Sequence, residues 1–192
     1  MPCHPAHHRR SLRLRDVDYS ATGAYFITIC TFQRACRFGA VVEVEMQLND
    51  DGVIVQEEWE KTAVVRSNVL LDEFVVMPNH FHAIIIIDNV GATRWVALDD
   101  PATENRATHR VATTSPGLIT GSLGAIIGQF KSAVTKRFNV MCATPGGPVR
   151  QRNYYERILR NDRELAAIRQ YIAANPARWA DDENHPSRKG NG

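Results

Sequence analysis

Two histidines, His80 and His82, lie in the middle of the most apolar stretch of the chain, residues 74–88 (FVVMPNHFHAIIIID). Successive side chains of a β-strand point to opposite faces, so both imidazoles would share one face at the start of a strand over 81–87. Buried polar side chains need partners, and neutral imidazole is the commonest metal ligand near neutral pH. The spacing therefore indicates a metal site. The simpler interpretation is a pair of partly exposed histidines that bind nothing.

A second pair of residues that could take part in chemistry is Tyr171 and Asn175, four residues apart near the end of the chain. The pattern predicts a helix that begins at Asn161 and ends at Pro176. A spacing of four places both side chains near one helix face, about one turn apart. Each also has a simpler interpretation, Tyr171 as an aromatic covering the helix edge and Asn175 as a helix-end residue.

The hydrophobic pattern predicts the elements that must position these residues. We expect helices over 53–65, 122–138 and 161–175, and strands over 24–32, 41–48, 69–77, 81–87 and 154–159. If the 41–48 strand is accessory, the order is β-α-β-β-α-β. This order predicts an α+β, ferredoxin-like fold, with an antiparallel sheet, helices on one face and an added C-terminal helix that carries Tyr171.

The length of 192 residues suits one domain with extensions, and 44% hydrophobic residues suffice for a core. We expect a basic flexible arm over 1–15, the domain over 16–180 and a tail over 181–192. Within the domain, residues 90–121 are polar, lack a period and are expected to form a flexible insertion.

The net charge of +2 is a weak argument for a polyanionic partner, but the basic residues are clustered. Such patches bind phosphate backbones even at low net charge, although ordinary solvated surface is the alternative. The clusters contain Arg9, Arg10, Arg13 and Arg15; Lys131, Lys136 and Arg137; and Arg150, Arg152, Arg157 and Arg160.

The cysteine pattern and the absence of a signal peptide favour a reduced, cytoplasmic setting. No zinc pattern or disulfide framework matches the four cysteines, Cys3, Cys30, Cys36 and Cys142. No apolar run is long enough to span a bilayer, so no membrane partner is expected.

Taken together, these segments resemble the REP-associated tyrosine transposases (RAYT), relatives of the single-strand transposases of the HUH superfamily (transposase IS200-like). The resemblance covers nearly the whole chain in order, apart from the two tails and residues 90–121. It is carried by GAYFITICT at 23–31, LDEFVVMPNHFHAIIII at 71–87, SLGAIIGQFKSAVTKRFN at 122–139, RNYYERILRND at 152–162 and IRQYIAANP at 168–176.

The resemblance implies a role for each matching position. His80 and His82 match the paired metal-binding histidines, and Asn175 matches the polar residue that completes the metal site. Tyr171 matches the nucleophile, which would form a 5′-phosphotyrosine and release a 3′-hydroxyl. Two imidazoles and an amide would be a neutral ligand set for Mg²⁺ or Mn²⁺, and Mn²⁺ tolerates nitrogen better.

Other positions near the last helix weaken or complicate this match. Tyr154 and Tyr155 are alternative nucleophiles, ranked second because they precede the helix in the family pattern. Arg157 stands where a histidine commonly follows the Tyr-Glu pair, and Arg150 stands where an aromatic residue is common. These departures concern DNA contacts and full activity, while Tyr171 is unaffected.

The partner that the resemblance implies is single-stranded DNA with a small hairpin of the repetitive extragenic palindromic (REP-like) kind. The expected DNA-binding residues are Arg9, Arg10, Arg13, Arg15, Lys131, Arg137, Arg152 and Arg157.

Two other functions remain open at this point. One is a domesticated DNA-hairpin-binding protein without catalysis. The other is a small metallohydrolase that uses His80 and His82 and would remain active after Tyr171→Phe. The short link from Ile158 to Asn161 favours a monomer over a homodimer with exchanged tyrosine helices.

Overall fold

The computed structural model describes residues 22–88, 121–141 and 153–190. The predicted arm, residues 90–120 of the predicted insertion, Arg150 and Arg152 lie outside these ranges. None of the helices in the described part of the chain is long and apolar enough to cross a membrane.

A four-stranded antiparallel sheet forms the centre of the fold. Its spatial order is β4-β5-β1-β6, with β5 and β1 in the middle. The strands are β1 (Gly23–Cys30), β4 (Val69–Met77), β5 (His80–Ile87) and β6 (Tyr155–Leu159). Every residue of β5 is buried, because helices cover both faces of this central strand.

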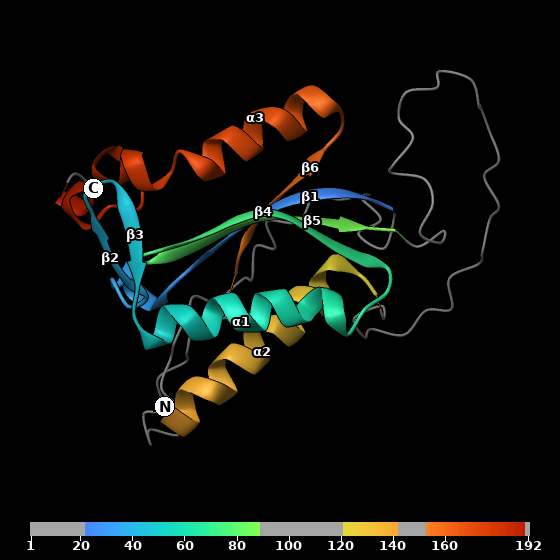
Figure 1. Cartoon of the computed structure of the whole chain (residues 1–192), viewed down its shortest axis with the longest axis horizontal. Helices are drawn as coiled ribbons and strands as arrows, with labels where there is room; N and C mark the ends of the chain where they lie inside the picture. Colours follow the sequence, from blue (N-terminus) through green and yellow to red (C-terminus); the bar gives the residue numbers. More distant parts are fainter. Residues whose placement is uncertain (1–21, 89–120, 142–152, 191–192) are drawn as a thin grey trace, which may run out of the picture.

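Helices α1 (Asp50–Val64) and α2 (Leu123–Met141) pack on one face of the sheet, and α3 (Asp162–Ala173) lies across the other (Figure 1). Asn49 and Asn161 cap α1 and α3, each accepting a hydrogen bond from the backbone N–H three residues on, at 3.0 and 2.9 Å. The predicted β-α-β-β-α-β order with an added C-terminal helix is confirmed.

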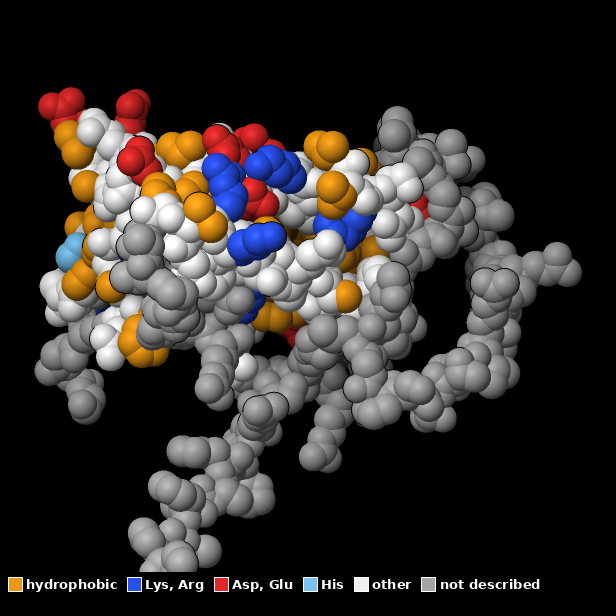
Figure 2. Space-filling view, turned by 90° about the horizontal axis from the view of Figure 1, so that it is seen from below, with side chains coloured by type: hydrophobic (Ala, Val, Ile, Leu, Met, Phe, Trp, Pro, Cys, Tyr) orange, Lys and Arg blue, Asp and Glu red, His pale blue; other side chains and the backbone are white. Residues whose placement is uncertain are grey.

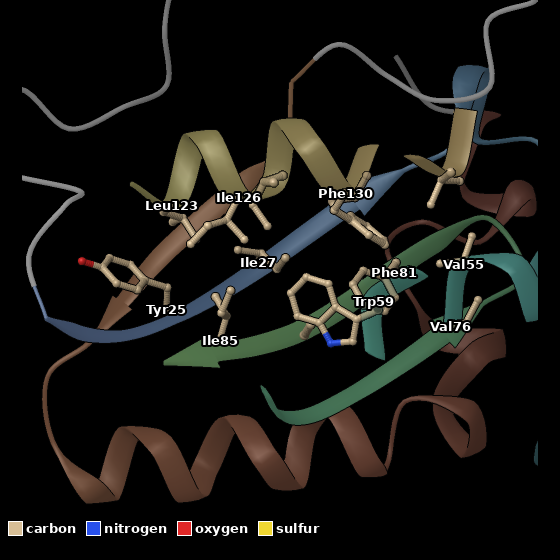
Figure 3. Close-up of a cluster of buried hydrophobic side chains, with 14 of the residues drawn as sticks. Tyr25, Ile27, Val55, Trp59, Val76, Phe81, Ile85, Leu123, Ile126 and Phe130 are labelled. Atoms are coloured by element: carbon tan, nitrogen blue, oxygen red, sulfur yellow. The ribbon is translucent and has the colours of Figure 1, made fainter. Parts of the chain in front are cut away.

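Two apolar cores lie on the two faces of the sheet. The larger fills the space under α1 and α2, where Trp59 packs edge-on against Phe81 and Phe130 (Figure 3). The smaller packs under α3 around Phe26, Ile84 and Ile172. Full burial of one such side chain contributes roughly 1.5–3 kcal/mol. The smaller core therefore holds α3, and with it Tyr171, against the sheet.

The prediction of one strand over 41–48 is wrong. The chain forms a hairpin instead, with β2 (Gly39–Val42) and β3 (Glu45–Leu48) as a separate two-stranded sheet. Glu43 and Val44 make the turn with φ of 49° and 67°. Hairpin turns with two positive φ angles normally carry Asn or Gly, so this sequence contains no recognisable turn signal.

The chain continues after α3 into two short 3₁₀ helices, η2 (Pro176–Asp181) and η3 (Pro186–Gly190). A further 3₁₀ helix, η1 (Phe32–Arg34), follows β1. Asp182 and Asn184, between η2 and η3, are buried at 8% and 3% exposure. Part of the segment expected to be a tail therefore packs against the domain.

Candidate active site

The two histidines lie at the start of β5, on the face that α3 covers. His80 is fully buried and His82 is 2% exposed. Thr28 of β1 is paired with His82 in the sheet register. The alternation of β5 puts both imidazoles on one face, as expected from the sequence, and the fold places the end of α3 over that face.

His82 has polar partners at both ring nitrogens. Its Nδ1 lies 2.8 Å from Oγ1 of Thr28, and its Nε2 lies 3.2 Å from the hydroxyl of Tyr171. Phe26 stacks on the ring at 5.3 Å between centroids. If Nδ1 carries the proton, it donates to Thr28, and the lone pair of Nε2 faces Tyr171.

The orientation of His80 follows from its neighbour Asn79. The amide nitrogen of Asn79 donates to the carbonyls of Arg34 and Asn184, at 3.0 and 2.7 Å, so its Oδ1 is the atom that faces His80. The Nδ1 of His80, 2.9 Å away, must then donate to this oxygen. In the neutral ring, Nε2 of His80 therefore bears a lone pair, and it is buried without a hydrogen-bond partner among the described residues.

Asp182 supplies a carboxylate to this group, which the sequence analysis did not identify. Its Oδ2 lies 4.0 Å from Nε2 of His80, and its Oδ1 accepts a hydrogen bond from the backbone N–H of Asn184 at 2.6 Å. Asn175 donates to Oδ2 over 3.5 Å, while its own Oδ1 is buried and has no partner among the described residues.

Nε2 of His80 and Oδ1 of Asn175 thus have no donor among the described residues, and Oδ2 of Asp182 has only the long hydrogen bond from Asn175. Unpaired buried acceptors are costly, and a cation satisfies all three at once. The ligand atoms of His80, His82 and Asp182 lie within 4.8 Å of one another. Adjacent ligands of an ion with bonds of about 2.1 Å lie about 3.0–3.4 Å apart, so these side chains would have to move closer together to hold Mg²⁺, Mn²⁺ or Zn²⁺.

Burial keeps both imidazoles neutral at neutral pH. Burial lowers the pKa of His80 to about 4, although the Asp182 carboxylate and Asn175 oppose the shift. Burial, and then the neighbouring His80, lower the pKa of His82 well below its usual value. Neutral imidazoles have the lone pairs that metal binding requires.

The hydroxyl of Tyr171 is harder to ionise than usual in the metal-free protein. Burial is the main cause of its raised pKa, and the carboxylates of Asp182 and Glu183 add to it, while a hydrogen bond with Asn175 opposes it. A positive charge at the site would act in the opposite direction, because it stabilises the phenolate.

The predicted basic residues are distributed over different surfaces. Lys131 is 5% exposed and donates to the carbonyl of Asn153 at 3.2 Å. Arg137 pairs with Glu57 and Glu58 at 2.6 and 3.0 Å, on the α1–α2 face, where Figure 2 shows Lys and Arg beside Asp and Glu.

Arg157 lies on the same face as the histidines. It is paired with Phe26 in the register of β1 and β6, and Phe26 belongs to the core under α3. Its guanidinium lies 3.4 Å from Glu164. Of the predicted DNA-binding residues that the structure describes, Arg157 is the one on the β6 side of the active-site face.

The two alternative tyrosines, at the start of β6 and just before it, lie on opposite sides of the sheet. Tyr155 is paired with Thr28 and lies on the histidine side. Tyr154 packs against the core of the other face, with Nζ of Lys131 4.7 Å from its ring centre. The structure therefore brings His80, His82, Tyr171, Asn175 and Asp182 together, with Tyr155 on the same face.

Comparison with known proteins gave matches in sequence and in structure, but no family model matches the chain. A protein of Haemophilus influenzae described as uncharacterized is 38% identical over 184 residues, which cover 92% of this chain and 93% of that protein. The structure of a REP-associated tyrosine transposase bound to a REP hairpin matches with a TM-score of 0.47 at 16% identity, over 82% of this chain and 68% of that one. A candidate transposase from Deinococcus radiodurans R1 matches with a TM-score of 0.41 at 15% identity, over 84% of this chain and 95% of that one.

Proposed function

We propose that this chain, which belongs to the same family as the Haemophilus influenzae protein, is a metal-dependent single-strand DNA endonuclease and strand transferase with a tyrosine nucleophile. The observation that carries the proposal is the position of the Tyr171 hydroxyl, 3.2 Å from Nε2 of His82 and beside the acceptor atoms of His80, Asn175 and Asp182. A nucleophile next to a cation site suits phosphoryl transfer, because the reaction needs an aligned attacker and compensation of negative charge.

The ligand set proposed here differs from the one predicted from the sequence. His80, His82 and Asn175 remain in it, and Asp182 adds a carboxylate. The set therefore has a charge of −1 instead of zero, and its mixture of nitrogen and oxygen favours Mn²⁺ over Mg²⁺. When bound, the divalent ion would polarise a phosphoryl oxygen and stabilise the charge that develops on it.

Nε2 of His82 can serve one partner at a time, either the Tyr171 hydroxyl or a metal ion. If these residues held a metal ion, the Tyr171 hydroxyl would lose this hydrogen bond, and its oxygen could approach a phosphorus atom. A bound cation would also offset the negative charge of Asp182, which is one cause of the raised pKa of Tyr171. This change in the pKa of Tyr171 would make the tyrosine a better nucleophile when the site is loaded.

The proposed reaction conserves phosphoester bonds. The Tyr171 oxygen gives its proton to solvent water and attacks the scissile phosphorus, and the bond from phosphorus to the 3′-oxygen of the preceding nucleotide breaks. That 3′-oxygen takes up a proton, which leaves a free 3′-hydroxyl and a 5′-phosphotyrosine. A second 3′-hydroxyl can then attack the phosphotyrosine and release Tyr171, which joins strands without ATP.

The proposed substrate is single-stranded DNA beside a REP-like hairpin, a choice that rests on the family resemblance of the sequence. Arg157 supports it, since this half-exposed guanidinium lies on the active-site face and can contact a phosphate. Lys131 and Arg137 remain predictions whose cations already have partners within the protein.

A denaturing gel tests the proposal. We would incubate the protein and Mn²⁺ with single strands that carry palindromic hairpins from the host genome, labelled at the 3′ end. A labelled protein band is expected for wild type and for the control Tyr155→Phe, but not for Tyr171→Phe. Because a 5′-phosphotyrosine keeps the 3′ fragment, 5′-labelled strands should yield only a shortened product.

Two results would contradict the proposal. Cleavage by Tyr171→Phe without any adduct would indicate water activated at the metal site. Hairpin binding with neither cleavage nor adduct in wild type would indicate a DNA-binding protein without catalysis.

A further inference from the structure

A groove of about 580 Å³ adjoins Tyr171, and most of its walls have no role in the proposed reaction. It lies between α3, β1, β6 and the segment between η2 and η3. Its lining includes Phe26, Arg34, Tyr155, Tyr171, Glu183 and Asn184. This volume falls within the range of small-molecule sites and exceeds what a single metal ion needs.

Tyr155 is the unusual residue of this groove, because a large aromatic side chain remains 53% exposed on an otherwise packed face. Tyr155, Thr28 and His82 are consecutive partners across β6, β1 and β5. Neighbouring strands lie about 4.8 Å apart, so the backbones of Tyr155 and His82 are roughly 10 Å apart. The exposed ring therefore lies close enough to the nucleophile to contact a nucleotide near the scissile phosphate.

The rings around Tyr155 give the groove an aromatic floor. Phe26 makes an edge contact with Tyr155 at 6.3 Å between centroids, and another with Tyr171 at 6.1 Å. These contacts support the Tyr155 ring while leaving half of the side chain open. A supported, exposed aromatic ring is the feature that proteins use to stack bases of single strands.

The charges of the lining favour a neutral ligand over a phosphate. Arg34 is the basic residue and Glu183 the acidic one among the lining residues. The guanidinium of Arg34 is partly engaged, since it donates to the carbonyl of Glu183 at 3.2 Å. One charge of each sign gives no excess positive potential for a phosphate.

Asn184 forms a packed part of the same wall. It is 3% exposed, and its Nδ2 has no hydrogen-bond partner among the described residues. Its Oδ1 accepts from Sγ of Cys30 at 3.7 Å, and its backbone N–H and carbonyl are bonded to Asp182 and Asn79. The Nδ2 atom is itself inaccessible to solvent, so Asn184 is part of the packed wall and the exposed ring of Tyr155 is the surface left to contact a ligand.

We propose that this groove is a nucleobase subsite, in which one base of single-stranded DNA stacks on Tyr155. The proposal rests on the proposed function for its partner, single-stranded DNA, but it does not require cleavage. Stacking is tolerant of sequence, so the subsite would hold a base beside the scissile phosphate with little sequence preference of its own.

The test compares two decamers by fluorescence anisotropy in the presence of a chelator, so that no cleavage occurs. One is (dT)₁₀, and the other has the same sugar–phosphate backbone without bases. Wild type should bind (dT)₁₀ more tightly than the abasic strand. Tyr155→Ala should weaken binding of (dT)₁₀ by about 5- to 100-fold, with little change for the abasic strand.

Two variants serve as controls for this experiment. Tyr155→Phe keeps the ring and should bind (dT)₁₀ within about twofold of wild type. Leu70→Ala removes a similarly exposed apolar side chain (51%). Leu70 is paired with Ile86, at the other end of β5 from His80, so this variant should bind (dT)₁₀ like wild type.

Equal binding of the two decamers by wild type, including no binding of either, would overturn the subsite. Unchanged (dT)₁₀ binding by folded Tyr155→Ala would do the same. If Tyr155→Ala fails to fold, photo-cross-linking of wild type to a strand containing 5-iodo-deoxyuridine decides the matter, since the cross-link must fall on Tyr155. Failure of the catalytic proposal looks different: no adduct on the gel, with the base-dependent binding intact.

Discussion

At the residue scale, the candidate metal group depends on Asp182, whose carboxylate faces a lone pair of His80 across 4.0 Å. We predict that Asp182→Asn weakens Mn²⁺ binding by about 10- to 100-fold, because the amide lacks the negative charge that offsets the ion. Isothermal titration of the DNA-free protein measures this affinity.

Asp181 provides the matched control for Asp182. Its side chain is 88% exposed and pairs with Arg188 at 3.5 Å, away from the histidines. Asp181→Asn should leave Mn²⁺ affinity unchanged. Equal losses in the two variants would mean that general surface charge attracts the ion, and the assignment of Asp182 would be wrong.

The buried imidazoles also make a prediction about stability and pH. A histidine in the unfolded chain has a pKa of about 6.5, but burial lowers the pKa of native His80 to about 4. Below pH 6.5 the unfolded state therefore binds a proton that the native state excludes, so the free energy of unfolding falls as pH drops toward 4. The loss for His80 alone is on the order of 3 kcal/mol.

Urea denaturation of the metal-free protein at pH 7.5, 6 and 5 tests this prediction. The unfolding midpoint should fall with pH in wild type and fall less steeply in His80→Gln, which cannot take up the proton. The same slope in both proteins would show that His80 does not control the acid sensitivity.

At the element scale, the β2–β3 hairpin has a turn that its sequence does not favour. Val44 has a φ of 67° and is 63% exposed, so its branched side chain is strained without packing in return. We predict that Val44→Gly raises the free energy of unfolding by roughly 0.5–1 kcal/mol, the balance of relieved strain and lost chain entropy. Thermal and urea unfolding give the value.

Val42→Gly in the neighbouring strand is the control for the hairpin. Val42 lies in β2, outside the residues with positive φ, where glycine only adds freedom to the unfolded chain and removes a strand side chain. This variant should therefore lower the stability. A loss of stability in Val44→Gly as well would contradict the strained turn.

At the scale of the whole molecule, the Tyr171 hydroxyl and the histidines meet within one chain. The hydroxyl of Tyr171 reaches Nε2 of His82 at 3.2 Å over a separation of 89 residues. We predict that Tyr171→Phe and His82→Ala chains, mixed in equal amounts, form no more DNA adduct than either alone. The denaturing gel of the proposed function measures this directly.

A restored adduct in that mixture would instead indicate exchanged α3 helices between two chains, with each Tyr171 serving the other chain's histidines. Wild type mixed with either variant serves as the positive control. The sequence interpretation favoured a monomer because the link from Ile158 to Asn161 is short, and this experiment decides that prediction.

The sequence alone determined the order of the main strands and helices along the chain, because periodicity and caps are local properties. The alternation around His80 and His82 placed both rings on one face, and Asn161 marked the start of α3. Tyr171 and Asn175 were identified as candidates from their spacing and from the family resemblance. Each of these signals lies within a few residues of the feature that it predicts.

The tertiary structure decided the parts that depend on contacts distant in sequence. Asp182 stands among other acidic residues without any period, and only the fold of η2 back onto β5 brings it to His80. The split of 41–48 into a hairpin was hidden because its turn lacks Gly and Asn. The groove beside Tyr155 likewise exists only where β1, β6, α3 and the segment around Asn184 meet, a proximity that no local pattern encodes.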